Sequence, residues 1–404
     1  MRYEYIRAEQ FCDSVRDGTH DTPKPTENGY KLVTGKHIRD GRVDPTEAYY
    51  ISEKDYNKIN ERSRVDQWDV LMSMIGNGLG RSAIVYDNPN YAIKNIALFK
   101  VRDEIKAKWL HYYLSGSEGQ GRIYNYLQGS GQPFISLTYL RDFPVPNPPR
   151  GLMSTIVGVL EKYDSLIDNN QKQIKLLEEA AQRLYKEWFI DLRFPGHEST
   201  PIVNGLPEGW QKKKTSEVCD TVGGGTPSTA KSEYFENGTI KWVTPTDLTK
   251  KNSLILLDTE KKITQAGLDN SSAKLLPPET ILMTSRASIG YFAVCEYEVC
   301  TNQGFIACIP KDEDMRFYLL FNLMSRTDEI KGKATGSTFL EITKRAFRNM
   351  SIIVPEKHIM SVFDKYVSYN VSRMRVLEKE NARLIMVRDR LLSKLMSGNL
   401  EVSK

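Results

Sequence analysis

The sequence predicts an α+β protein in which two similar modules alternate with two long helices. One observation is a heptad pattern of apolar residues that occurs twice, and the other is an internal repeat of the segments between. The expected order is a first module over 1–150, a helix over 151–195, a second module over 196–355 and a helix over 356–404. Each module is expected to be α+β.

The first helix is predicted from a seam whose positions alternate steps of four and three. An average step of 3.5 residues is the repeat of a coiled coil. Charged residues such as Glu161 and Lys172 fall between the seam positions, as expected for a solvated face. The seam positions are Ile156, Leu160, Tyr163, Ile167, Asn170, Ile174, Leu177, Ala181, Leu184 and Trp188.

The second helix is predicted by a similar, less apolar seam. At 1.5 Å per residue, each helix of about 35 to 40 residues is roughly 55–60 Å long. Antiparallel pairing lets the second module return the chain to the start of the second helix, with pseudo-twofold symmetry. Two unrelated core helices of one large domain are the alternative. The second seam comprises Ile359, Phe363, Tyr366, Asn370, Arg373, Leu377, Glu380, Leu384, Val387 and Leu391.

The two modules read as divergent copies because matching segments follow in the same order. Short β-prone runs alternate with turn residues in both copies, with a helix after the last run. The matches include Cys12-Asp13-Ser14-Val15 with Cys219-Asp220-Thr221-Val222, Asn95 with Asn302, and Phe134-Ile135-Ser136-Leu137-Thr138 with Phe339-Leu340-Glu341-Ile342-Thr343.

Composition and charge limit the classes of function. Hydrophobic residues make up 40% and charged residues 26%, which predicts a soluble globular chain without a membrane span. Five cysteines, without zinc spacing, favour reduced thiols in the cytoplasm. A net charge of +5 permits a nucleic-acid partner without arguing for one.

Motifs for catalysis are largely absent. Asn147-Pro148-Pro149 is followed by Arg150 instead of an aromatic residue, so this segment is read as a stiff linker rather than a methyltransferase motif. Gly223-Gly224-Gly225 lacks the Lys and Ser or Thr of a phosphate loop and predicts a close backbone approach. No metal site and no catalytic residues are predicted.

The loops instead offer side chains suited to reading polar edges. Arginine can pair with guanine and Asn or Gln with adenine, while Lys and Ser can hold phosphates. The framework matches between copies while the loops differ, as expected if two modules read two different sequences. The DNA-binding candidates are Thr19, His20, Lys36, His37, Arg39, Asn77, Arg81, Gln132, Thr226, Ser228, Lys231, Thr246, Asp247, Ser285, Arg286, Ser288, Ser337 and Thr338.

The chain resembles the specificity subunit of type I restriction–modification enzymes over its full length. The resemblance rests on Leu206-Pro207-Glu208-Gly209-Trp210, Gly224-Gly225-Thr226-Pro227-Ser228, Ser288-Ile289-Gly290 and Asn302-Gln303-Gly304, and on the run from Phe339 to Pro355. The first module lacks the Leu-Pro-x-Gly-Trp opening, and Thr19-His20 replaces Thr226-Pro227.

This resemblance implies a non-catalytic DNA-binding subunit with two target-recognition domains, each reading half of a bipartite asymmetric site. The helices would set the spacing and bind two methyltransferase subunits, with motor–nuclease subunits joining the full complex. S-adenosylmethionine, magnesium and ATP would belong to those partners. The alternatives are a specificity module fused to or serving another DNA-modification or phage-defence enzyme, and a coiled-coil scaffold without sequence readout.

Overall fold

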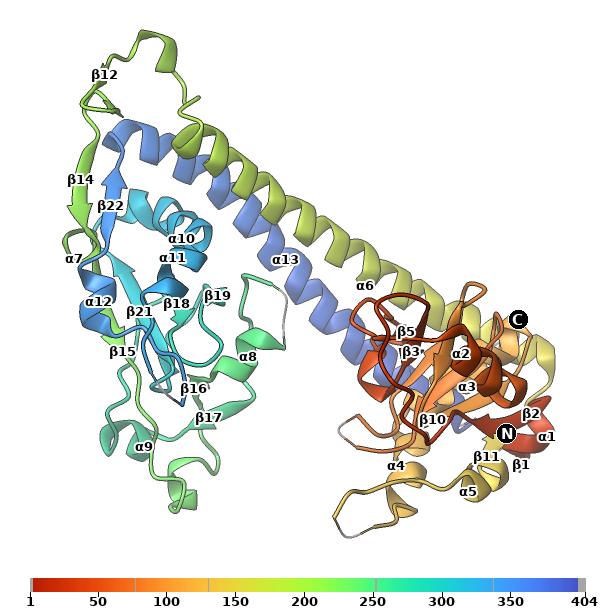
Figure 1. Cartoon of the computed structure of the whole chain (residues 1–404). Coiled ribbons are helices and arrows are strands. Elements are labelled where there is room, and N and C mark those ends of the chain that lie inside the picture. Colours follow the sequence, from red (N-terminus) through yellow and green to blue (C-terminus); the bar gives the residue numbers. More distant parts are fainter. Residues whose placement is uncertain (1–2, 77, 130, 251–252, 337, 399–404) are drawn as a thin grey trace. The chain divides into compact units, whose positions relative to one another are not determined.

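A computed structural model describes residues 3–76, 78–129, 131–250, 253–336 and 338–398 (Figure 1). The chain divides into two compact units. Unit 1 comprises Met1–Leu166 with Arg383–Lys404, and unit 2 comprises Ile167–Ala382. The boundary therefore falls within both long helices, α6 (Arg150–Tyr185) and α13 (Lys357–Met396). Each unit consists of one module and a part of each long helix.

Unit 1 is built on a four-stranded antiparallel sheet with the order β2-β10-β7-β8. These strands are Ser14–Asp17, Ile96–Lys100, Val70–Ser73 and Ser82–Ile84, and the last three are buried along their whole length. A three-stranded sheet contains β6 (Tyr50–Ile51), β3 (Tyr30–Val33) and β9 (Tyr91–Ile93), in which β3 and β9 are parallel. A third sheet pairs β1 (Tyr5–Arg7) with β11 (Pro144–Pro146).

Unit 2 repeats this topology strand for strand. Its antiparallel sheet has the order β15-β21-β18-β19, and a second sheet, β17-β16-β20, again contains one parallel pair. The duplication predicted from the sequence is therefore confirmed. The strands are Cys219–Gly223, Phe305–Pro310, Ile281–Thr284 and Phe292–Ala293, then Lys261–Ile263, Ile240–Val243 and Cys300–Thr301, and finally the pair β14 (Gln211–Lys214) and β22 (Ser351–Val354).

Helices cover both modules. The predicted helices are α3 (Glu104–Ser115), capped where Asp103 accepts a hydrogen bond from the Lys106 amide, and α10 (Arg316–Ser325). The remaining helices are α1 (Ala8–Phe11), α2 (Glu53–Ser63), α4 (Ser117–Asn125), α5 (Leu137–Asp142), α7 (Thr215–Val218), α8 (Pro245–Thr249), α9 (Gln265–Asp269), α11 (Thr327–Gly332) and α12 (Lys344–Arg348). Shorter elements are β4 (Ile38–Arg39), β5 (Arg42–Val43), β12 (Ile202–Val203), β13 (Leu206–Pro207) and the 3₁₀ turns Gly35–His37, His197–Ser199, Ser232–Tyr234 and Glu313–Met315.

The proline-rich join after the first module begins as a strand, and the predicted stiff linker, Asn147-Pro148-Pro149, follows it before α6. Pro144 and Pro146 flank Val145 in β11, which pairs antiparallel with β1 in a two-stranded sheet. Proline lacks an amide hydrogen and is tolerated in an edge strand. The Trp109 indole donates to the Pro146 carbonyl at 2.7 Å, which fixes the start of α6 against α3.

The two long helices pair antiparallel within each unit (Figure 1). In unit 1, Ile156 and Leu160 near the start of α6 share a core with Leu392 and Leu395 near the end of α13. In unit 2, Trp188 in the π-helical turn after α6 (Lys186–Ile190) lies 6.0 Å between ring centroids from Phe363 near the start of α13. All ten predicted seam positions of the first helix are buried or half-buried.

The α13 seam runs one residue later than predicted over much of its length. Phe363 and Leu377 are buried as expected, whereas Tyr366 is 60% exposed and Val387 is 43% exposed. Leu384 and Leu391 are half-buried. Two steps of four follow Phe363, because a nearly straight helix with 3.6 residues per turn drifts from a strict heptad. The buried positions after Phe363 are Val367, Val371, Met374, Leu377, Asn381, Leu392, Leu395 and Met396.

Candidate nucleic-acid interface

The first group of candidates surrounds the ends of β2 and β9. His20 is exposed, and its two ring nitrogens lie 2.8 Å from Asn95 Oδ1 and 3.0 Å from Asp17 Oδ2. Asp17 also pairs with Arg62. Thr19 is half-buried. The imidazole is thus held in one orientation at the surface, as a side chain that reads a ligand must be.

The loop after β3 separates surface residues from a structural one. Lys36 and Arg39 are exposed, and Arg39 Nε donates to the Lys36 carbonyl at 3.1 Å. His37 is buried and accepts from the Thr34 amide at 2.9 Å. Burial and the charge of Lys36 lower the pKa of His37, so the imidazole stays neutral at pH 7. His37 therefore shapes the loop, while Lys36 and Arg39 face solvent.

Asp247 occupies the matching position in unit 2. Thr244 follows β16 as Thr34 follows β3, and the Asp247 carboxylate accepts from the Thr244 amide at 2.8 Å and hydroxyl at 2.7 Å. Its other oxygen accepts from the Glu260 amide at 2.8 Å. Asp247 is buried, so its carboxylate holds the loop and leaves Thr246 exposed beside it.

The glycine-rich loop of unit 2 approaches the protein's own backbone. A Cβ on Gly224 would lie 2.1 Å from the Asn302 carbonyl oxygen, and one on Gly225 would lie 2.2 Å from Ser272 Oγ. This packing explains the predicted need for glycine. It brings Thr226 beside Gln303, to which the Thr226 hydroxyl donates a hydrogen bond. Gln303 is a surface partner that the residue-by-residue prediction missed, although it lies in the Asn302-Gln303-Gly304 motif.

The other candidates lie in the loops after β7 and β18 and in neighbouring loops. Ser285 is buried, and its carbonyl accepts from the Ile342 amide at 3.0 Å, so it serves the framework. The exposed candidates in these and neighbouring loops are Arg81, Gln132, Ser228, Lys231, Arg286, Ser288 and Thr338. Asn77 and Ser337 lie outside the described residues.

Exposed apolar residues accompany these polar ones. Phe339 is 56% and Leu340 53% exposed beside Arg286, whose guanidinium carbon lies 6.0 Å from the Phe339 ring centroid. In unit 1, Tyr126 is 55% exposed and stacks on Tyr139. Apolar groups exposed among basic and polar loops are typical of a binding surface. The sequence signal for Phe339 was its place in the repeat.

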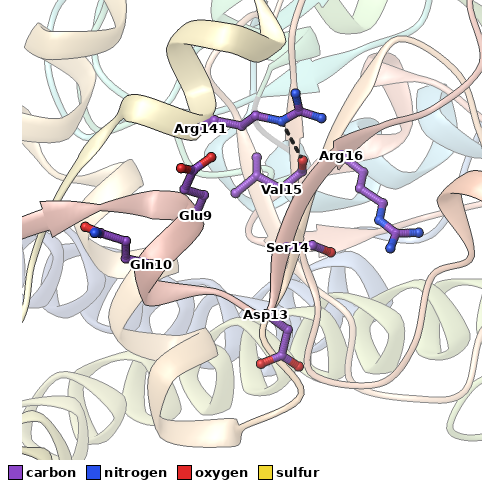
Figure 2. Close-up of a pocket in the computed structure, with 7 residues that line it drawn as sticks. All are labelled: Glu9, Gln10, Asp13, Ser14, Val15, Arg16 and Arg141. Atoms are coloured by element: carbon purple, nitrogen blue, oxygen red, sulfur yellow. Dashed lines mark hydrogen bonds between the residues drawn. The ribbon is translucent and has the colours of Figure 1, made fainter.

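A pocket of about 360 Å³ opens between α1, β2 and α5 of unit 1 (Figure 2). Glu9 and Asp13 face Arg16 and Arg141 across it, and Arg141 Nε donates to the Val15 carbonyl at 3.2 Å. Its opposite charges balance, so the pocket does not suit a polyanion.

The described parts of the chain contain no cluster of three metal-ligating His, Cys, Asp or Glu residues. Among the same residues, no helix combines the length and hydropathy needed to cross a bilayer. All five cysteines are buried free thiols.

Comparisons with known proteins agree with this architecture. Residues 207–378 match the family described as Type I restriction modification DNA specificity domain. The type I restriction enzyme MjaIX specificity subunit of Methanocaldococcus jannaschii is 33% identical over 186 residues, which is 44% of this chain and 43% of that relative. The chain thus spans less than half the length of this relative.

Two longer matches cover most of the chain. The type I restriction enzyme HindI specificity subunit of Haemophilus influenzae is 21% identical over 84% of this chain and 88% of that subunit. The crystal structure of a type I restriction–modification S subunit from M. genitalium matches 99% of this chain and 97% of its own, with a TM-score of 0.56 and 15% identity, and supports the fold. Residues 207–378 therefore match the type I restriction–modification specificity family, and the chain as a whole is similar to the specificity subunits of such systems.

Proposed function

We propose that this chain is the non-catalytic DNA-recognition subunit of a type I restriction–modification complex, with each module reading one half of a bipartite, asymmetric site. The observation that carries the proposal is the pairing of one repeated framework with two different sets of loop side chains. Equivalent positions hold His37 in one module and Asp247 in the other, and their neighbours Lys36 and Thr246 are exposed.

The partners in this proposal are two methyltransferase subunits, with motor–nuclease subunits in the full complex. S-adenosylmethionine, magnesium and ATP are assigned to those subunits. The spacer helices supply surface for docking. On unit 2, Leu176 is 64%, Tyr369 74% and Val376 52% exposed, although all three lie on paired helices. Such apolar side chains suit the packing of helices from a partner.

Methylation provides the test. The purified chain should not methylate or cut DNA, whereas adding its cognate methyltransferase subunit should give methylation at one split motif, read by sequencing. Replacing Lys36 and Arg39 with Ala should weaken recognition of the first half, by about 1–3 kcal/mol if a bidentate base contact is lost. A matched pair, Lys54→Ala with Lys58→Ala on α2, controls for the loss of two positive charges.

Two results would refute the proposal. One is turnover by the highly purified chain alone. The other is an assembled complex that binds or methylates DNA without preference for sequence, which would favour a scaffold. Service to a different DNA-modification enzyme would appear as sequence-selective binding without methylation by a type I partner.

A further inference from the structure

Two hairpin loops have the same backbone bonding in the two modules. In unit 1, Gln128 and Phe134 exchange amide–carbonyl bonds of 2.9 Å in both directions. In unit 2, Thr335 and Glu341 do the same at 3.0 and 2.9 Å. The next bond also matches, since Ile135 donates to the Met74 carbonyl and Ile342 to that of Ser285, both at 3.0 Å. Phe134 and Glu341 therefore occupy equivalent positions.

The partner position is equivalent as well. Phe134 bridges Ile75 in the loop after β7, and Glu341 bridges Arg286 in the loop after β18. The same two backbone positions thus carry Ile75 with Phe134 in unit 1 and Arg286 with Glu341 in unit 2. An apolar pair in one module becomes a charged pair in the other, although the backbone around it is kept.

The side chains of the charged pair are accessible. Arg286 Nε lies 3.8 Å from Glu341 Oε2, and the two side chains are 45% and 44% exposed. An exposed ion pair at this distance contributes little to folding, typically under about 1 kcal/mol. The ion pair therefore contributes little to the stability of the module. Its two opposite charges can instead pair with the acceptors and donors on the edge of a polar ligand.

Base-pair chemistry distinguishes the two pairs. In the major groove, guanine offers two acceptors, which suit arginine, and cytosine offers an amino donor, which suits a carboxylate. Thymine instead offers a methyl group, which suits apolar side chains. Phe134 is 36% exposed, so its ring can make such a contact.

Resting on the proposed function, we propose that these two positions form a base-pair reader in each module. Arg286 and Glu341 read one G·C pair in the second half-site, with Arg286 on guanine and Glu341 on the cytosine amino group. Ile75 and Phe134 read a thymine methyl group at the corresponding pair of the first half-site. Glu341 is a specificity residue that the loop composition alone did not identify.

Exchanging the pairs tests the proposal in the full chain assembled with its methyltransferase. The double variant Arg286→Ile with Glu341→Phe should replace a G·C requirement in the second half with a preference for an A·T pair, and leave the first half unchanged. The reciprocal variant, Ile75→Arg with Phe134→Glu, should replace an A·T requirement in the first half with G·C. Genome-wide sequencing of methylated sites reads both outcomes.

A milder variant keeps the test valid if the exchanges disturb folding. Glu341→Gln removes the charge but keeps the shape, and should lower discrimination for the G·C pair about tenfold, a loss of one specific contact. Glu329→Gln is the matched control, because Glu329 pairs with Arg326 at 2.8 Å and its side chain is 42% exposed. This control should leave the motif unchanged.

The outcomes separate the two proposals. If the wild-type complex methylates no split motif, the proposed function itself fails. If it does so, but the exchanged and Glu341→Gln variants keep every base preference, the base-pair reader is wrong. A loss of affinity that is equal for all bases would assign the pair a structural role and also overturn the inference.

Discussion

Asp164 of α6 accepts a hydrogen bond from Arg388 of α13 at 2.7 Å within unit 1. The same carboxylate accepts from the Tyr112 hydroxyl of α3. One side chain therefore joins both long helices to the module. The ion pair of Lys108 on α3 with Glu161 on α6, at 2.5 Å, is a second link between the module and a long helix. In unit 2, Arg316 on α10 pairs with Asp364 on α13 at 3.6 Å.

Removing the charge of Asp164 should lower the free energy of unfolding of unit 1. Asp164→Asn removes the anionic partner that the Arg388 guanidinium, 27% exposed, has on α6, and leaves Arg388 paired with its neighbour Asp389 on α13. We expect a loss of about 1–2 kcal/mol in the free energy of unfolding. Chemical denaturation measures it, with Glu380→Gln as a control at an exposed position of α13. Equal stability of the two variants would contradict this role.

A second prediction concerns two buried asparagines in unit 2. Counting eighteen residues back from Trp188 and forward from its neighbour Phe363 places Asn170 and Asn381 at about the same level of the antiparallel pair. Among the described residues, Asn170 Nδ2 and Asn381 Oδ1 have no hydrogen-bond partner. Replacing both with Leu should raise the free energy of unfolding by about 1–3 kcal/mol.

The matched control for this change is Ile174→Leu, a volume-conserving exchange in the same buried seam. Each single Asn→Leu variant should gain less than the double variant. A double variant that is less stable than the wild type would show that the amides bond to each other in solution, as a register-setting polar pair does.

The third prediction is a loss of stability in acid that depends on His111. Burial lowers the pKa of His111 from 6.5 to about 4, and Ser82 Oγ lies 2.9 Å from its Nδ1. Below pH 6.5 the His111 imidazole is protonated in the unfolded chain but stays neutral in the folded chain until the pH approaches 4. Stability from this group is therefore complete above pH 6.5 and is lost as pH falls toward 4, by about 3 kcal/mol.

His111→Asn, which keeps a polar group near Ser82, should flatten this part of the pH profile. Thermal unfolding between pH 4 and 8 provides the measurement. His358→Gln is the control, because His358 is exposed on α13. If both variants follow the wild-type profile, His111 does not carry the effect.

The fourth prediction treats the long helices as a ruler. Inserting one heptad after Asn170 and one after Asn381 keeps the apolar face aligned. It adds about 10 Å, or roughly three base pairs. The two specific halves of the methylated motif should stay the same while the gap between them lengthens. The added pairs also rotate one half-site, which DNA bending would have to absorb.

Insertions of four residues at the same places are the control, because they turn the seam away from its partner and should impair folding or methyltransferase binding. Sequencing of methylated sites gives the gap for each active variant. A folded and active heptad variant with the original gap would show that the length of the helices does not set the spacing of the two half-sites.

The regular parts of the fold were predictable because their signals are repeated. The α6 seam contains one apolar stripe, so its register followed from spacing alone. In α13, Tyr366 and Val367 are both apolar, and the sequence could not decide which one faces α6. In the folded chain Val367 is buried and Tyr366 is exposed.

The alignment of the two modules was correct in order but shifted in places. Asn302 corresponds to Lys94, not Asn95, since the amides of Lys94 and Asn302 donate to Val33 and Val243 at matching strand positions. Ile342 corresponds to Ile135 and not to Leu137, because the amides of Ile135 and Ile342 donate to the equivalent carbonyls of Met74 and Ser285. At these positions the sequence alignment followed similar side chains. Equivalence is instead defined by backbone hydrogen bonds, which cannot be read from the sequence.

The candidate site was only partly predictable for a related reason. His37 and Asp247 have the residue types of base readers, yet both are used to cap the turn after a strand. A Thr three residues before each, Thr34 and Thr244, was the available signal for this capping box. Exposure of Lys36, Arg39 and Arg286 depends on tertiary packing, which one sequence does not reveal.

The interleaving of the two units also determines when each can fold during synthesis. Unit 2 is one uninterrupted segment, so all its parts are present once Ala382 has left the ribosome. Unit 1 begins first, but its core includes Leu392, Leu395 and Met396. The core of unit 1 is therefore completed only when the end of α13 has been made, so the unit that is started first is completed last.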